Sequence, residues 1–396
     1  MLFVVTFPFF GIQHYKNTTI FANCLFYKYI NHKTRVKNRT ANMNRCKEQV
    51  IINQGKVSLR KESFDTLKFF LAFFVVIIHT GFTGWIGLGS DAISRIAVPL
   101  FFMITGYYLP TMTEEKFKKH FHKVIYLTVI STLFYSLFSY AQSITGESSY
   151  NWFTQTFNMK NICLWLLFNF TKPIAGHLWY FYALLYVLII IYIGRKTKRI
   201  GLLYMFLPLL FLGNYILSYF LNITYRNFLF IGLPYVLLGC LFRNNEKQFK
   251  IYTMKSPTLI LSLLFCCLGL GLEMLFYKYT DTKIIRDHFL FTLPMAICVF
   301  TLALKHPHWG ANSLLTTIGK KYSAHIYIMH LCVIKLIPHG FIFLCEKDTY
   351  EQIAQSNLFQ NSYPFLVFGT TLIIAFVFNK LWSLFLQKTN TKQIAN

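Results

Sequence analysis

The sequence has few charged residues, and acidic residues are the scarcest of them. Only 13% of the 396 residues are charged, with 14 Asp or Glu against 39 Lys or Arg, whereas 55% are hydrophobic. Soluble domains carry roughly 25% charged residues, so this composition excludes a water-soluble globule, a coiled coil and a disordered chain. The apolar runs are long and unbroken, which excludes the ten-residue alternation of a transmembrane β-barrel.

The sequence also lacks the motifs of metal sites and of soluble enzymes. Its nine cysteines include no CxxC pair, and most lie inside apolar runs, where a thiol behaves as a small hydrophobe. We therefore expect no metal centre and no disulfide framework. There is also no glycine-rich phosphate loop, GxSxG motif or HExxH motif. Any chemistry must be carried by the apolar segments themselves.

Ten apolar stretches are long enough to cross a membrane as helices of roughly 20 residues. They are 64–82, 93–110, 124–141, 176–193, 200–221, 226–242, 256–277, 288–304, 322–344 and 363–387. A shorter apolar stretch, 161–170, is expected to lie at the outer interface or to re-enter the membrane. These patterns predict an all-α, polytopic membrane helix bundle of about ten transmembrane helices.

The net charge of +25 lies in short clusters between the apolar runs. Such clusters orient membrane proteins, so we expect no nucleic-acid partner. With the N-terminus inside, the internal loops hold seventeen Lys and Arg and the external loops seven. This asymmetry predicts that both termini are cytoplasmic and that the protein is a multi-pass protein of the plasma membrane.

The chain divides into three parts by composition. Residues 1–62 form a basic extension that we expect to be poorly ordered, and Met43 is a candidate for the true start. Residues 63–388 form the membrane domain, and residues 389–396 a cytoplasmic tail.

Ionisable residues inside a span are costly and therefore point to function. In the first span, Lys68 and His79 are eleven residues apart, which is close to three helical turns. Both lie on one face, separated by about 16 Å along the axis. The structural alternative is that Lys68 extends to the inner interface while His79 ends the helix at the outer one.

Two further candidates open later spans at the expected outer end. Arg95 begins the second span, where Pro99 bends the helix and frees a carbonyl, and it could instead be an interface anchor. His177 begins the fourth span beside Trp179 and Tyr180, which an aromatic belt at the interface would also explain.

The ninth span places an imidazole near the membrane midplane. His330 shares a helical face with Ser323 and Tyr327, and it lies roughly 13 Å into the bilayer from Lys321. Because an imidazole facing lipid there is unfavourable, we expect His330 to face the bundle interior.

Four segments that contain these residues resemble one known family. They are FDTLKFFLAFFVVIIHT (64–80), SRIAVPLFFMITGYYL (94–109), GHLWYFYALL (176–185) and YSAHIYIMH (322–330). In order and spacing they resemble the acyltransferase-3 family of integral membrane acyltransferases. That family includes O-antigen and enterobacterial common antigen O-acetyltransferases and the membrane half of serine racemases of vancomycin resistance. The segment 94–109 is most similar to the common-antigen and racemase-type branches.

The resemblance implies transfer of an acyl group, often acetyl, from cytoplasmic acyl-CoA to an acceptor at or outside the membrane. The family's catalytic histidine falls on His79, and its arginine near the second span falls on Arg95. Eleven positions before the histidine the family usually has Arg. Here the residue is Lys68, which cannot make the bidentate contacts of Arg.

Transfer from a thioester to a hydroxyl requires a base, for which we expect His79. Arg95, with His177 or Tyr327, is expected to stabilise the oxyanion. Lys68 and the clusters 116–123 and 195–199 would hold the CoA phosphates. His330 would line a tunnel from the cytoplasm, and an acyl-enzyme on Ser323 is an alternative route.

The expected partners are membrane lipid, acyl-CoA and an envelope glycan or small-molecule acceptor, and a homodimer is left open. The main rival interpretation is a transporter or flippase for an amino acid or envelope precursor, although two similar halves with broken helices are not evident. A receptor or scaffold without chemistry is a third interpretation, which the intramembrane histidines disfavour.

Overall fold

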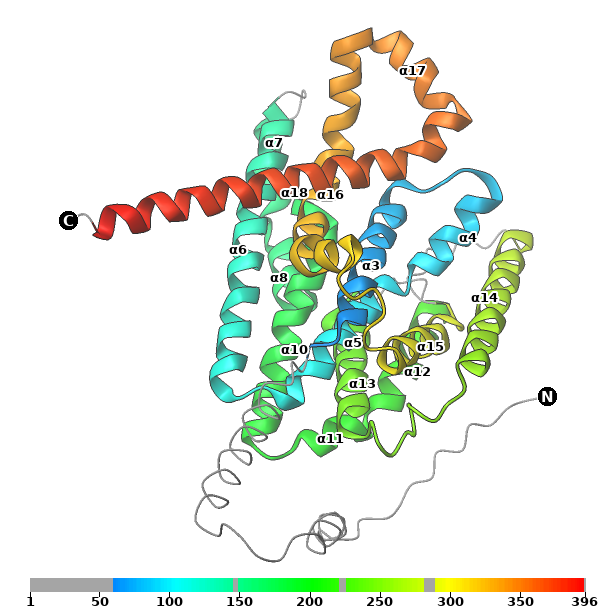
Figure 1. The fold of residues 1–396 in the computed structure, drawn as a ribbon. Coiled ribbons are helices and arrows are strands. Elements are labelled where there is room, and N and C mark those ends of the chain that lie inside the picture. Colours follow the sequence, from blue (N-terminus) through cyan, green and yellow to red (C-terminus); the bar gives the residue numbers. More distant parts are fainter. Residues whose placement is uncertain (1–59, 145–148, 221–225, 281–288, 395–396) are drawn as a thin grey trace, which may run out of the picture. The chain divides into compact units, whose positions relative to one another are not determined.

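The computed structural model describes residues 60–144, 149–220, 226–280 and 289–394. Contacts divide the chain into residues 1–60 and 61–396. Most of the predicted extension 1–62, including Met43, therefore lies outside the described residues, as do the last two residues of the predicted tail. The described residues form helices and no strands (Figure 1).

Seven helical segments of the described chain are long and apolar enough to cross a membrane. They are α3 (Glu62–Thr80), the segment Gly84–Thr111, α6 (Glu114–Ile144), the segment Lys172–Lys196, α14 (Ser256–Tyr279), α16 (Leu314–Cys345) and the part Asn357–Leu381 of α18 (Asn357–Ile394). The segment Gly84–Thr111 consists of α4 (Gly84–Ser94), α5 (Ala97–Tyr108) and η1 (Leu109–Thr111). The segment Lys172–Lys196 consists of α9 (Lys172–Ala175), η2 (Gly176–Leu178) and α10 (Trp179–Lys196).

Three of the ten predicted spans fall on shorter apolar helices. These are α12 (Leu207–Phe220), η3 (Phe228–Gly232) with α13 (Leu233–Asn244), and α15 (Thr292–Lys305). The predicted all-α polytopic bundle is thus confirmed, with seven helices of full length instead of ten among the described residues. The remaining helices are α7 (Ser149–Thr156), α8 (Met159–Phe168), α11 (Ile200–Met205) and α17 (Lys347–Gln355), of which α8 falls on the predicted short apolar stretch.

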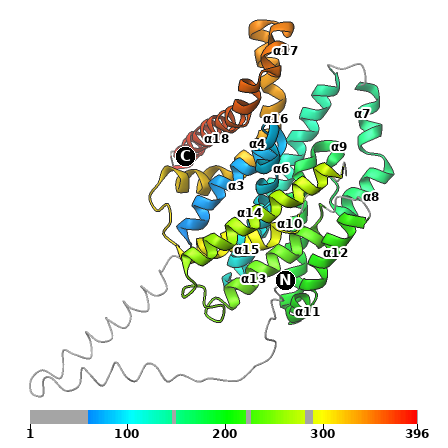
Figure 2. The same cartoon turned by 90° about the vertical axis from the view of Figure 1, so that its right-hand side faces the viewer.

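α3 packs along α16 (Figures 1 and 2), and α5 packs along α13 (Figure 1). Glycines make both contacts close. A Cβ on Gly319 would collide with the Asp65 carbonyl oxygen of α3. A Cβ on Gly106 would collide with the backbone of α13, and one on Gly239 with the backbone of α5. Small residues of this kind let membrane helices approach at backbone distance.

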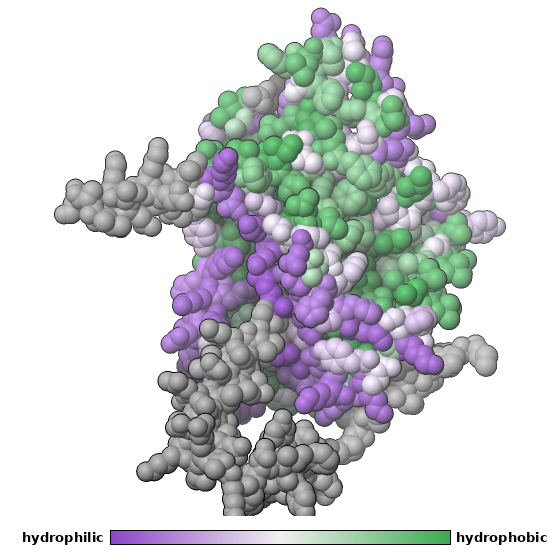
Figure 3. All heavy atoms as spheres, in the orientation of Figure 1, coloured by the Kyte–Doolittle hydropathy of each residue, from purple (hydrophilic) through white to green (hydrophobic). Residues whose placement is uncertain are grey.

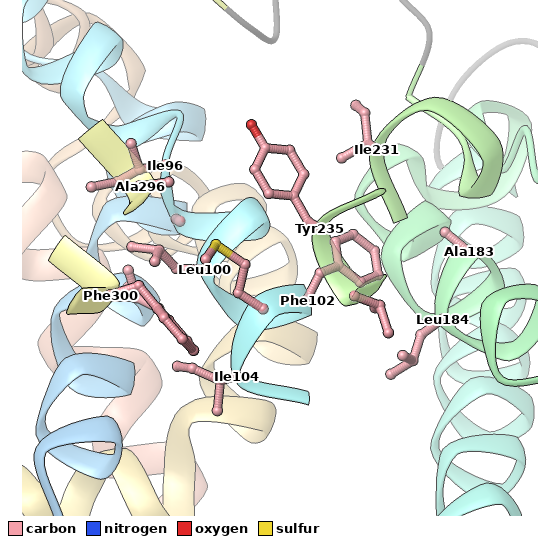
Figure 4. Packing of buried hydrophobic residues seen from close by; sticks show 14 of the residues in the cluster. Ile96, Leu100, Phe102, Ile104, Ala183, Leu184, Ile231, Tyr235, Ala296 and Phe300 are labelled. Carbon is pink, nitrogen blue, oxygen red and sulfur yellow. The ribbon is translucent and has the colours of Figure 1, made fainter. Parts of the chain in front are cut away.

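The main hydrophobic core surrounds α5. In Figure 4, Leu100 and Ile104 of α5 lie toward Phe300 of α15, and Phe102 lies toward α10 and α13. Leu100, Phe102 and Phe300 have no exposed surface. This packing fixes α5 between α15 on one side and α10 and α13 on the other.

The basic clusters lie at one end of the bundle, which we term the basic end. There the start of α3 meets the segment after α13, because Lys61 Nζ lies 3.1 Å from Glu246 Oε1. The start of α6 meets the end of α10, where the Arg195 guanidinium lies 5.6 Å from the centre of the Phe117 ring. Asn244, at the end of α13, donates a 3.5 Å hydrogen bond to Tyr204 of α11. This bond connects the end of α13 with the helix that follows α10.

The hydropathy of the surface also differs between the two ends of the bundle. Hydrophilic side chains gather in the lower part of Figure 3, and hydrophobic ones cover the upper and right-hand parts of the same face. We term the opposite end of the helices, where α3 finishes and α10 begins, the histidine end.

Candidate active site

Two helix ends place the first pair of predicted residues. His79 occupies the last turn of α3, and the helix stops at Gly81, whose φ of 70° lies in the region that favours glycine. Arg95 lies at the break between α4 and α5. Pro99 has no N–H to bond the Arg95 carbonyl, so the predicted bend is found at this point.

Three histidines from three helices meet at the histidine end. The ring centres of His79 and His330 are 5.0 Å apart, and those of His177 and His330 are 5.2 Å apart. His330 has no exposed surface, so its predicted interior placement is confirmed. The sequence singled out each histidine separately, and the fold brings them into one cluster.

Backbone carbonyls set the proton positions on two of these rings. His330 Nδ1 lies 2.7 Å from the Tyr327 carbonyl oxygen, and His177 Nε2 lies 3.3 Å from that of Ile328. Since a carbonyl only accepts, each of these nitrogens carries the hydrogen. His330 Nε2 and His177 Nδ1 are then acceptors, and both are buried with no hydrogen-bond partner among the residues that the structure describes. Buried polar atoms normally have partners, so these two nitrogens can receive a hydroxyl or a water.

A small cavity of about 50 Å³ opens beside His79. Its polar lining comes from His79, Arg95, His177, Arg226 and Tyr327. The remaining lining residues are Val75, Ile78, Val98, Pro99, Trp179 and Ile231. A base and two guanidinium groups thus surround one pocket with mainly apolar walls.

Asp91 fixes the orientation of Arg95. Arg95 Nη2 lies 2.7 Å and 3.0 Å from the two carboxylate oxygens of Asp91, one turn earlier on α4. Helix α4 is not predicted from the sequence, because its run GWIGLGSDAIS is rich in glycine and contains the acidic Asp91. The helical pairing at i and i+4 is the signal that would have revealed it.

Arg226 is a site residue that sequence reasoning missed, since it was counted only as an external loop cation. Asn169, fully buried after α8, donates from Nδ2 to the Arg226 carbonyl at 3.2 Å and accepts from the Phe228 N–H at 3.0 Å. It also donates to the Trp179 carbonyl at 3.4 Å. The predicted interfacial stretch 161–170 therefore contains, one residue before its end, the asparagine that holds the Arg226 backbone beside the start of α10.

Two other assignments change with the structure. Trp179 is only 9% exposed and lines the cavity, so the aromatic-belt interpretation is wrong for it. The Tyr327 hydroxyl donates to the His177 carbonyl, which ties α16 to η2. Tyr135 of α6, which the sequence did not single out, donates to the Ile328 carbonyl at 2.6 Å, and its ring centre is 4.7 Å from that of His177.

Lys68 and Ser323 lie away from this cavity. Lys68 Nζ is 3.2 Å from Asp65 Oδ1, a carboxylate only 2% exposed one turn earlier on α3. Ser323 is buried on α16, seven residues before His330. Neither residue lines the histidine cavity or the larger cavity near the basic end.

The predicted tunnel is not continuous in these two cavities. The larger one, about 800 Å³, extends from Lys305 and His306 at the basic end to Phe74 and Ile96. Phe74 and Ile96 directly adjoin Val75 and Arg95 in sequence, which line the histidine cavity. The two cavities therefore share helices α3 and α4–α5 as walls, and neither alone connects Lys68 with His79.

Apolar helices that enclose histidines and arginines define a multi-pass membrane protein with a polar interior site. Residues 61–380 match the family model Acyl_transf_3, described as an acyltransferase domain. The chain therefore belongs to the acyltransferase-3 family, and the protein is a membrane acyltransferase. Searches of curated proteins and of solved structures gave no significant match.

Proposed function

We propose that the protein transfers an acyl group, acetyl in the simplest case, from cytoplasmic acyl-CoA to a hydroxyl of a cell-envelope glycan or other surface acceptor. The observation that carries this proposal is the single cavity shared by His79, Arg95, His177 and Arg226. The plasma membrane is its proposed location, and membrane lipid, the donor and the acceptor are its proposed partners.

His79 is the proposed general base. Its exposed side chain lines the cavity, whereas His330 is fully buried behind it. His79 accepts the proton of the acceptor hydroxyl while the oxygen attacks the thioester carbonyl. Collapse of the tetrahedral intermediate forms the ester, breaks the C–S bond and returns the proton to the leaving thiolate as free CoA thiol. His177 Nδ1 and His330 Nε2 have no hydrogen-bond partner among the described residues, so each can accept a hydrogen bond from the acceptor hydroxyl or from a water during this step.

Arg95 and Arg226 are the proposed oxyanion-stabilising groups. Both line the cavity, and positive charge fixed in an apolar pocket favours the oxygen on which negative charge develops. The Tyr327 hydroxyl already donates to the His177 carbonyl, so its role in the proposal is to position η2.

Lys68 and the basic clusters 116–123 and 195–199 are the proposed contacts for the CoA phosphates. The start of α6 and the end of α10 meet at the basic end, which supports a shared anion site there. Lysine suits this task because it binds phosphate as a point charge. In this proposal the CoA phosphates bind at the basic end of α3, and acyl transfer takes place at its histidine end.

The test uses the purified full-length chain in lipid vesicles with acetyl-CoA and an envelope-polymer extract as acceptor. Release of CoA thiol and mass spectrometry of the polymer are measured together. His79→Ala should lower both by at least about 100-fold, in line with loss of a general base. His339→Ala, an exposed histidine on α16, is the matched control and should retain activity.

Acyl transfer by a folded His79→Ala variant at the control rate would contradict the role of His79. If the unaltered protein releases no CoA thiol and transfers no acyl group, but takes up an envelope precursor, the result would favour a transporter.

A further inference from the structure

The larger cavity is a groove between α3, α14, α15 and the α4–α5 junction, and the acyl-transfer proposal does not use it. Its volume is about 800 Å³. Apart from a few residues at one end, its walls are hydrocarbon or sulfur. These lining residues include Phe70, Phe74, Ile260, Leu263, Met295 and Val299.

The length of the groove corresponds to one leaflet. Along α14 it extends from Ser256 to Cys267, eleven residues or about 16 Å of helix rise. The hydrocarbon core of a bilayer is about 30 Å thick, so half of it is about 15 Å. Ile260 on the groove wall is 48% exposed, which leaves α14 accessible from the surrounding lipid.

Cationic and polar groups surround the mouth of the groove at the basic end. Lys305 Nζ donates to the Met254 carbonyl, and His306 Nε2 lies 3.0 Å from Ser256 Oγ. His308 Nδ1 lies 3.4 Å from Glu62 Oε2, the carboxylate that faces this mouth. Trp309, 52% exposed, lies at the same level, and tryptophan favours the membrane–water boundary.

We propose that this groove binds an acyl chain of an anionic phospholipid whose headgroup phosphate lies at Lys305 and His306. An apolar wall of one-leaflet length suits hydrocarbon, and the cation at its mouth complements the phosphate. The pantetheine arm of CoA is a poorer fit, because its amide groups would find few hydrogen-bonding partners along these walls. The bound lipid would fill the space between α14 and α3 and so brace the helix that carries His79.

The test uses quenching of Trp309 fluorescence in the full-length chain by brominated lipids. The protein is reconstituted in phosphatidylcholine vesicles that contain equal fractions of brominated phosphatidylglycerol or brominated phosphatidylcholine. Subtracting the signal of Trp309→Phe isolates Trp309. We expect phosphatidylglycerol to be preferred by about five-fold, the factor for one cation beside an anionic headgroup.

The variant Lys305→Gln with His306→Gln should abolish this preference. Lys255→Gln, an exposed lysine at the same end that does not line the groove, should keep it. Native mass spectrometry of the same samples provides a second measurement, since the unaltered protein should retain phosphatidylglycerol that the double variant loses. Equal quenching by the two lipids, or an unchanged preference in the folded double variant, would overturn the proposal.

Discussion

Among individual residues, Arg226 carries the sharpest prediction. Arg226→Ala should lower the rate of acyl transfer by roughly 100-fold, the effect of removing one oxyanion-stabilising donor. The acyl-CoA KM should change little, because Arg226 lies at the histidine end. Lys160→Ala, an exposed cation on α8 that does not line the cavity, is the matched control. The measurement is CoA release under saturating donor, and equal rates in the two variants would exclude Arg226 from the reaction.

The sequence predicts some site residues and misses others for a physical reason. His79, His177 and His330 stand out because imidazoles are costly within apolar runs. Arg226 does not stand out, since its place depends on Asn169, which is 57 residues away in the chain. Asp91 is missed for the same reason as α4, because its glycine-rich surroundings hide the helix that pairs it with Arg95.

At the scale of helices, the close contact of α5 with α13 should not tolerate a side chain at Gly106. Gly106→Ala places a methyl group against the Val236 carbonyl, so the helices must separate. We expect a loss of about 1–3 kcal/mol in the free energy of unfolding, which is typical of overpacking. Gly271→Ala on α14 meets open space and is the control. Thermal unfolding in detergent measures both, and equal midpoints would show that α5 and α13 can move apart without cost.

The segment after α13 is joined to α3 and α5 by a carboxylate. Burial raises the pKa of Glu246, but hydrogen bonds from Tyr252 and Tyr107 and the charge of Lys61 outweigh it, so the pKa lies below its ordinary value. A carboxyl with a depressed pKa stabilises the fold fully above its unfolded pKa of about 4.3. That stabilisation disappears as the pH falls through the folded value.

Glu246→Gln should therefore lower the free energy of unfolding at neutral pH by about 1 kcal/mol after allowance for screening, and lower the unfolding midpoint with it. The difference in midpoint between the unaltered protein and Glu246→Gln should disappear as the pH falls below about 4.3, the ordinary pKa of a glutamate. Exposed Glu115→Gln serves as the control and should leave the midpoint unchanged. A gap that stays constant across the acid range would mean that Glu246 acts through packing alone.

Helix positions follow from the sequence more directly than helix lengths do. A helix falls on each of the ten stretches that hydropathy predicts, but only seven are long enough to cross a membrane among the described residues. α15 is only 14 residues long yet packs against α3, α5 and α14. A helix buried among other helices need not be as long as the bilayer is thick. The average hydropathy of its residues does not show whether it is buried in this way.

For the whole molecule, the testable statement is its orientation in the membrane. Cys163 is exposed on α8, which leads into Asn169 at the histidine end. An impermeant maleimide added to intact cells should label it, and Cys163→Ser should lose that label. Lys198→Cys, made in the Cys163→Ser background, should react only after the membrane is opened. The reverse pattern would place the basic end outside.

The stretch of α3 between Lys68 and His79 has a consequence for the energised cell. Leu71, Ala72 and Val75, with Leu100 and Met103 of α5, expose at most 2% of their surface. Hydrocarbon packed this closely gives ions and protons no path along that side of α3, which limits the leak of the membrane voltage through the bundle.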